Sequence, residues 1–105
     1  MPAPERSHAL HAIRARLRPG SPFVVMHLST GSDAGGRARW LARDAAFAIA
    51  NGIDPEMAQR RCEVMARDLH VLGPAQDEAL LREAGFAGIE VFYVGGAFRG
   101  WICHA

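Results

Sequence analysis

The C-terminal end of the sequence constrains the fold most, because two strand-like runs there are separated by only a few residues. Ile89 to Val94 and Phe98 to His104 are rich in β-branched and aromatic residues, which favour strands. Gly95-Gly96 lies between them and suits a tight hairpin. The last strand is therefore expected to run antiparallel to the strand before it.

A third strand is predicted much earlier in the chain. Phe23 to Leu28 is a short apolar run without alternation, which is typical of a strand covered on both faces in a parallel sheet. The helical sequence between this run and Ile89 provides a crossover connection, and such crossovers join parallel strands in a right-handed sense. The sequence thus predicts an α/β fold with a partial doubly wound sheet, in which two strands are parallel and the C-terminal strand is antiparallel.

Apolar spacing predicts helices in the remaining segments. The predicted helices span Glu5 to Leu17, Arg37 to Asn51, Pro55 to Leu72 and Ala75 to Ala84. Asn51-Gly52 ends the second helix and Asp54 is a suitable N-cap for the third, so these two form a helical hairpin. In the second helix we expect Trp40, Leu41, Phe47, Ala48 and Ile49 on the buried side.

The composition limits the class of protein. A chain of 105 residues, half of them hydrophobic, provides for one small domain. All twelve basic residues are arginines and they are scattered, so neither nucleic acid nor a membrane surface is predicted as a partner. The sequence contains no run typical of a transmembrane span or signal peptide, and we expect a cytoplasmic protein with Cys62 and Cys103 as buried free thiols.

Two phrases resemble class I S-adenosylmethionine-dependent methyltransferases. The segment from Glu78 to Val94, with Leu80-Leu-Arg-Glu-Ala-Gly-Phe86 at the helix end, followed by Phe98-Arg-Gly-Trp101, is similar to the last helix and last two strands of that family. The segment from Ile13 to Val25 is similar to the helix, Pro-Gly turn and fifth strand of the family. The helical hairpin, about residues 37–72, lies where family members carry variable insertions that cover the substrate.

The resemblance implies a single partial domain over residues 1–105, the C-terminal half of a methyltransferase fold. The full enzyme would transfer a methyl group from S-adenosylmethionine to a small molecule. The family's first strand, its Gly-rich turn and its ribose-binding acidic residue have no counterpart in the sequence. We therefore expect no cofactor-binding residues in this chain, and no binding of S-adenosylmethionine by the chain alone. The family's strand order also places the last strand between the other two.

Candidate site residues follow from the rule that ligands bind beyond the carboxyl ends of parallel strands. His27 is the candidate catalytic acid or base, although a histidine satisfied by a hydrogen bond at a strand end is an equal alternative. Arg99 is a candidate for binding an acidic group of the substrate, with a solvated hairpin charge as the alternative. The predicted substrate-binding residues are Ser29, Trp40, Phe47, Phe98 and Arg99.

Other readings of the sequence remain open. Ser29 to Gly36 follows a strand and precedes a helix, as phosphate loops do, but a mobile loop is the preferred interpretation. His8 and His11 are one helical turn apart without a third ligand nearby, so no metal site is predicted. A non-enzymatic interaction module is the alternative function, with an unpaired edge at Phe23 to Leu28 that favours self-association or pairing with a complementary N-terminal half.

Overall fold

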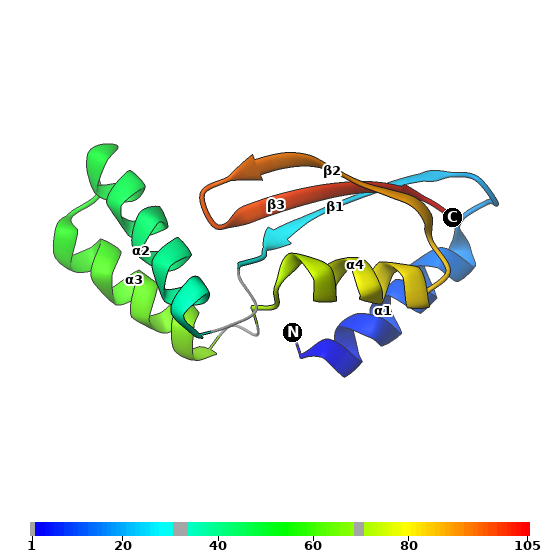
Figure 1. Ribbon diagram of the computed structural model, residues 1–105, viewed down its shortest axis with the longest axis horizontal. Coiled ribbons are helices and arrows are strands. Elements are labelled where there is room, and N and C mark those ends of the chain that lie inside the picture. The colour runs from blue at the N-terminus through cyan, green and yellow to red at the C-terminus, as the bar shows by residue number, and fades with distance from the viewer. Residues whose placement is uncertain (1, 31–33, 69–70) are drawn as a thin grey trace.

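A computed structural model describes residues 2–30, 34–68 and 71–105. The elements are α1 (Ala3–Arg16), β1 (Pro22–Leu28), α2 (Ala34–Ala50), α3 (Pro55–Asp68), α4 (Pro74–Glu83), β2 (Ala87–Gly95) and β3 (Phe98–His104). The described parts form an elongated molecule measuring 46 × 24 × 20 Å, with the sheet and two helices at one end and the helical hairpin α2–α3 at the other (Figure 1).

The three strands form one antiparallel sheet in the order β1-β3-β2. Val25 lies opposite Trp101 in the β1–β3 pair, and Val91 lies opposite the same tryptophan in the β2–β3 pair. The expected position of the last strand, between the other two, is confirmed.

The expectation of a doubly wound sheet with two parallel strands is wrong. β1 and β2 are not hydrogen-bonded to each other, because β3 lies between them and pairs antiparallel with both. Within the described residues, parallel pairing is limited to an isolated bridge between Ser29 and Leu72. A helical connection leads to parallel pairing only where the two strands that it joins become neighbours in the sheet. Here β3, the second strand of the C-terminal hairpin, lies between β1 and β2.

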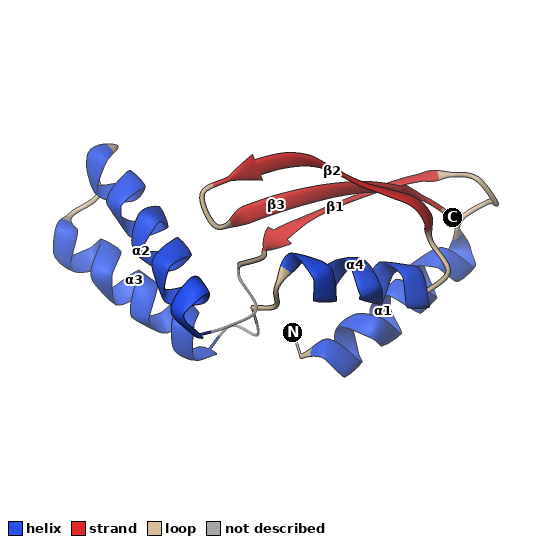
Figure 2. Cartoon of the chain, viewed as in Figure 1, coloured by secondary structure: helices blue, strands red, loops and turns tan. Residues whose placement is uncertain are grey.

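The helices α1 and α4 cover one face of the sheet, whereas the other face carries no described helix (Figure 2). The expectation that residues 23–28 are covered on both faces is therefore wrong. Phe23 and Val25 pack against the core under the helices, whereas Val24 and Met26 remain 54% and 51% exposed. Side chains alternate between the two faces of a strand, so an apolar run without alternation leaves half of its side chains on the open face.

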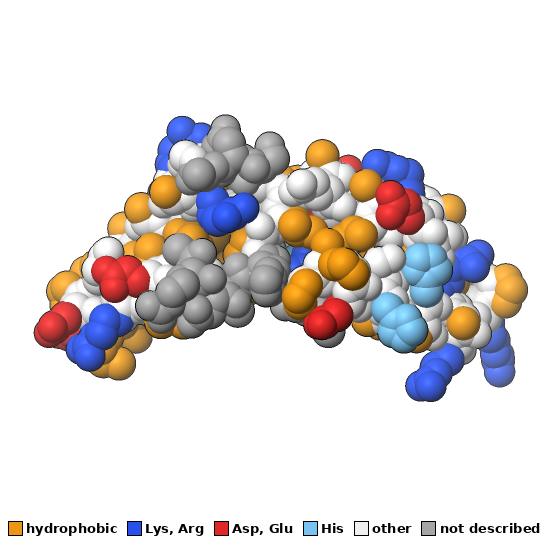
Figure 3. Space-filling view, turned by 90° about the horizontal axis from the view of Figure 1, so that it is seen from below, with side chains coloured by type: hydrophobic (Ala, Val, Ile, Leu, Met, Phe, Trp, Pro, Cys, Tyr) orange, Lys and Arg blue, Asp and Glu red, His pale blue; other side chains and the backbone are white. Residues whose placement is uncertain are grey.

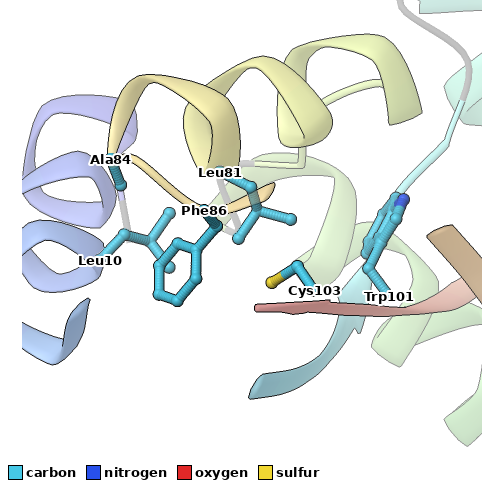
Figure 4. Packing of buried hydrophobic residues seen from close by; sticks show 6 residues of the cluster. All are labelled: Leu10, Leu81, Ala84, Phe86, Trp101 and Cys103. Carbon is cyan, nitrogen blue, oxygen red and sulfur yellow. The ribbon is translucent and has the colours of Figure 1, made fainter. Parts of the chain in front are cut away.

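The core lies between the sheet and these two helices (Figure 4). Trp101 and Cys103 of β3 are fully buried against side chains of the helices, and the Phe23 and Phe86 rings stack with centroids 5.0 Å apart. The Trp101 indole donates a hydrogen bond to Glu78, so its one polar atom is satisfied at the edge of the core. The buried members of this cluster are Leu10, Leu81, Ala84, Phe86, Trp101 and Cys103.

α4 ends at Glu83, within one residue of the end predicted from the sequence. Gly85 follows the helix with φ of +98°, in the left-handed region that glycine adopts without strain. The Phe86 amide then donates to the Leu81 carbonyl, and both side chains are buried in the same cluster. This cap orients β2 so that it follows the sheet back over α4.

The hairpin α2–α3 is confirmed, but its buried side is smaller than predicted. Leu41 and Met65 pack with Ala97 of the β2–β3 turn in a second, smaller cluster. Phe47 and Ile49, both expected to be buried, are 70% and 42% exposed. Asp54 caps α3 as predicted, because its side chain accepts a hydrogen bond from the Met57 amide at 3.1 Å.

The connection after β1 is shorter than the predicted mobile loop. Ser29 and Thr30 are buried, and their amides donate to the carbonyls of Ala97 and Leu72. α2 already includes Gly35 and Gly36, while the predicted loop residues 31–33 lie outside the described residues. This segment therefore connects β1 by hydrogen bonds to the β2–β3 turn and to the residues just before α4.

The surface agrees with the scattered arginines of the sequence. In the view from below, basic side chains are spread over the face and do not form one stripe (Figure 3). None of the described helices has the length and apolar character needed to cross a membrane.

Candidate functional site

Two pockets lie near the carboxyl end of β1. The larger, about 860 Å³, opens between the helical hairpin and the β2–β3 turn, and we call it the lid pocket. Both pockets fall in the volume range of small-molecule sites. The lid pocket is lined by Met26, Trp40, Arg43, Asp44, Phe47, Ala48, Ile53, Arg61, Tyr93, Gly95, Gly96 and Phe98.

The smaller pocket, about 460 Å³, lies under the sheet between β1 and the first turns of α1 and α4, and we call it the His27 pocket. Its walls are mostly apolar, with one histidine, one arginine and one aspartate. It is lined by Arg6, Leu10, Val25, Met26, His27, Leu28, Val71, Asp77, Leu81 and Phe98. Met26 and Phe98 line both pockets.

The orientation of the His27 ring assigns its tautomer. Nδ1 lies 3.1 Å from the Leu28 carbonyl oxygen, which can only accept, so Nδ1 carries the proton in this contact. In the neutral ring Nε2 is then an acceptor. Nε2 lies 3.8 Å from Oδ1 of Asp77. This geometry suits a proton acceptor.

Asp77 is a buried carboxylate that the sequence analysis did not single out. Its side chain is 1% exposed, and its two oxygens accept hydrogen bonds at 2.7 Å from Arg6 and from the Ser29 hydroxyl. Its place in the first turn of α4 also favours a negative charge. The sequence signal was an acidic residue early in a helix, which interaction with the helix dipole already explained. The ion pair joins α1 to α4, and the serine joins both to the end of β1.

Arg99 lies opposite His27 in the β1–β3 pair, so both side chains are on the same face of the sheet. Its Nε donates to the Ser29 carbonyl oxygen at 3.3 Å, and its guanidinium carbon is 5.8 Å from the Trp40 ring centroid. Arg99 thus contacts the helical hairpin through Trp40, but it lines neither pocket.

The structure brings together three of the six predicted site residues. Trp40 and Phe47 of α2 and Phe98 of β3 all line the lid pocket. His27 lies in the other pocket, and Ser29 is 1% exposed and engaged with Asp77. Four of the six predicted site residues therefore line two adjoining pockets, and Ser29 and Arg99 line neither.

Two arginines of the lid pocket were not predicted as site residues. Arg43 lies over the Trp40 ring, with its guanidinium carbon 4.7 Å from the centroid, and Arg61 lines the pocket from α3. In the sequence both were among the scattered arginines, with no pattern that set them apart. Only the packing of α3 against α2 brings them to one pocket.

Comparison with known proteins gives a fold likeness and no family. No family model and no curated protein matches this chain. Among solved structures, a "possible exported protein" from Bordetella parapertussis is similar over 97% of this chain, with a TM-score of 0.59 and 19% sequence identity. The match covers 33% of that chain, so this chain spans about a third of its length. At this identity the likeness concerns the fold alone.

Proposed function

We propose that this chain is the acceptor-binding portion of an S-adenosylmethionine-dependent methyltransferase that acts on a small molecule. The observation that carries the proposal is the lid pocket, where Trp40, Phe47 and Phe98 meet from separate segments. These are residues that the sequence analysis expected to bind substrate, from their place beyond the carboxyl ends of the predicted strands. Aromatic walls with a few polar groups are typical of small-molecule sites.

The arrangement of the strands also supports this proposal. The order β1-β3-β2, with the C-terminal strand in the middle, is the order that the resemblance implied for the end of the enzyme. The proposal does not depend on parallel pairing in the described sheet. The methyl donor would be held by a separate polypeptide segment, because the described pockets contain none of the donor-binding elements that the resemblance requires.

In this proposal His27 accepts a proton from the acceptor. Its Nδ1 is occupied by the Leu28 carbonyl, and its Nε2 borders the His27 pocket. The lid pocket and the His27 pocket adjoin at Met26 and Phe98, which line both. Methyl transfer is displacement at an electrophilic methyl group, so the contribution of these residues is positioning and removal of one proton. A cytoplasmic location is part of the proposal, and the two free cysteines are consistent with it.

The proposal is tested by purifying the natural assembly through a tag on this chain and assaying it with S-adenosylmethionine labelled in the methyl group. We expect label in a small-molecule product, and a loss of about tenfold or more in kcat/KM for Phe47→Ala. Met57→Ala is the matched control, because Met57 is an exposed apolar residue of the same hairpin, 59% exposed, that does not line the pocket. Absence of transfer, or equal transfer by the Phe47 and Met57 variants, would contradict the proposal.

The alternative function is a non-enzymatic module that pairs with another chain, and the free edge of β1 favours it. β1 is at the edge of the sheet. Val24 and Met26 of β1 are exposed, and so is Phe92 of β2, which is 54% exposed. Exposed apolar edges promote pairing with other strands. Sedimentation of the wild type and of Val24→Lys distinguishes the two, since the module requires association that the lysine weakens. A wild-type chain that remains monomeric at micromolar concentration argues against the module.

A further inference from the structure

The lid pocket combines exposed aromatic rings with two cationic groups. Phe47 and Tyr93 are 70% and 46% exposed, although both line a concave surface. Large apolar side chains that remain accessible in a hollow are typical of ligand sites. The flat rings of these residues suit a flat aromatic partner, which stacks on them with ring centroids about 4.5 to 7 Å apart.

The charge of the pocket favours an anion. Arg43 and Arg61 line it together with a single acid, Asp44. Within residues 2–30, 34–68 and 71–105, neither arginine forms an ion pair with a carboxylate. Arg43 instead lies over the Trp40 ring and is exposed to solvent. A guanidinium group binds a carboxylate through two parallel hydrogen bonds, which an ammonium group cannot do.

We propose that the lid pocket binds an aromatic carboxylate, with the ring against Phe47 and Tyr93 and the carboxylate toward Arg61 and Arg43. This inference deepens the proposed function, because it names the chemical class of the methyl acceptor. It rests on the proposed function in that only there is the ligand a methyl acceptor. Binding itself requires no methyl donor, so it is measured independently of transfer.

The probes are naphthalene carboxylate and naphthalene carboxamide, which share the ring system and differ in charge. Calorimetric titration of the purified chain should give saturable one-to-one binding of the carboxylate. We expect binding of the carboxamide to be weaker by about fivefold to tenfold, the contribution of one partly exposed charged hydrogen bond. Added salt should reduce the difference between the probes, because exposed charges are screened.

Neighbouring residues provide the controls. Arg61→Gln should abolish most of the preference for the carboxylate, whereas Arg60→Gln should leave it unchanged, because Arg60 does not line the pocket. Phe47→Ala should weaken both probes by about tenfold, and Ile49→Ala should weaken neither. These four variants change exposed residues of the hairpin, so folding is preserved and each result concerns the ligand.

Three outcomes would overturn the inference. They are no saturable binding of the carboxylate up to millimolar concentration, equal binding of the two probes, or equal effects of Arg60→Gln and Arg61→Gln. Failure of the proposed function is a different result. In that case the carboxylate binds with the expected dependence on Arg61, but the tagged assembly transfers no methyl group. Conversely, methyl transfer by the tagged assembly without saturable binding of the carboxylate would retain the function and refute the inference.

Discussion

The two ends of this molecule use apolar residues differently. In the layer formed by the sheet, α1 and α4, large side chains such as Trp101 and Leu81 are 0% and 2% exposed. In the hairpin α2–α3, Phe47 and Met57 are 70% and 59% exposed, and burial is concentrated at Leu41 and a few neighbours. Apolar residues at helical spacing therefore have two uses here. At one end they hold the fold together, and at the other some of them line an open pocket.

The largest expected effect comes from the core. Leu81→Ala removes a buried side chain between α4 and β3, and it should lower the free energy of unfolding by about 2 to 5 kcal/mol. Phe47→Ala should change it by less than about 0.5 kcal/mol, because the ring is mostly exposed. Denaturant unfolding of the two variants measures both values. Similar losses in the two variants would mean that Phe47 belongs to a core rather than to a ligand site.

The buried ion pair should give the next largest effect. Asp77→Asn removes the carboxylate charge that faces Arg6, whose side chain is 17% exposed, and should cost about 1.5 to 3 kcal/mol, the value of a hydrogen bond to a charged group. Asp44→Asn is the matched change in the lid pocket, and it should cost less than about 0.5 kcal/mol. An equal cost for the two substitutions would show that Asp77 does not anchor α1 to α4.

The helix cap at Asp54 tests the hairpin itself. Asp54→Ala removes the acceptor of the Met57 amide at the start of α3 and should cost about 1 kcal/mol. Asp54→Ser, which retains an acceptor at the cap, should recover most of the loss. Thermal unfolding followed by circular dichroism measures the difference, and an alanine variant as stable as the serine variant would remove the role of this cap.

The reactivity of the two cysteines provides a chemical comparison of the same two regions. Burial raises the pKa of the Cys103 thiol above its ordinary value, whereas Cys62 of the hairpin is half-buried. The pKa of Cys103 is higher in the folded than in the unfolded protein, so its contribution to the free energy of unfolding is fully present below the unfolded pKa of about 8.5. That contribution is lost as the pH rises through the folded pKa. A thiol reagent at neutral pH should therefore label Cys62 well before Cys103. Replacing Cys103 by Ala should flatten the alkaline loss of stability, and equal labelling rates would contradict this comparison.

Much of the fold could be predicted from the sequence because local signals were strong. Gly85 and Phe86 at the end of α4, and Asp54 at the start of α3, adopt the expected caps. The class of sheet was not predictable from the run at residues 23–28. An apolar strand has the same kind of sequence whether its second face is covered or open. Val24 and Met26 are exposed on that face.

The candidate site was predictable only where aromatic residues marked it. Trp40, Phe47 and Phe98 were expected near one another and all line the lid pocket, whereas their role in binding substrate stays a prediction. Asp77 and Arg61 were not predicted, because their significance depends on contacts between distant segments. Arg6 and Asp77 are 71 positions apart, and no local pattern indicates such a pair.

The central functional claim is that this chain holds the acceptor while another segment holds the methyl donor. Calorimetric titration of the purified chain with S-adenosylmethionine tests this division most directly. The account predicts no saturable binding, because the contacts that remain on the acceptor side would supply only part of the free energy needed to offset the loss of translational and rotational freedom. Saturable one-to-one binding at low micromolar donor would contradict it, and would place a complete donor site within this chain.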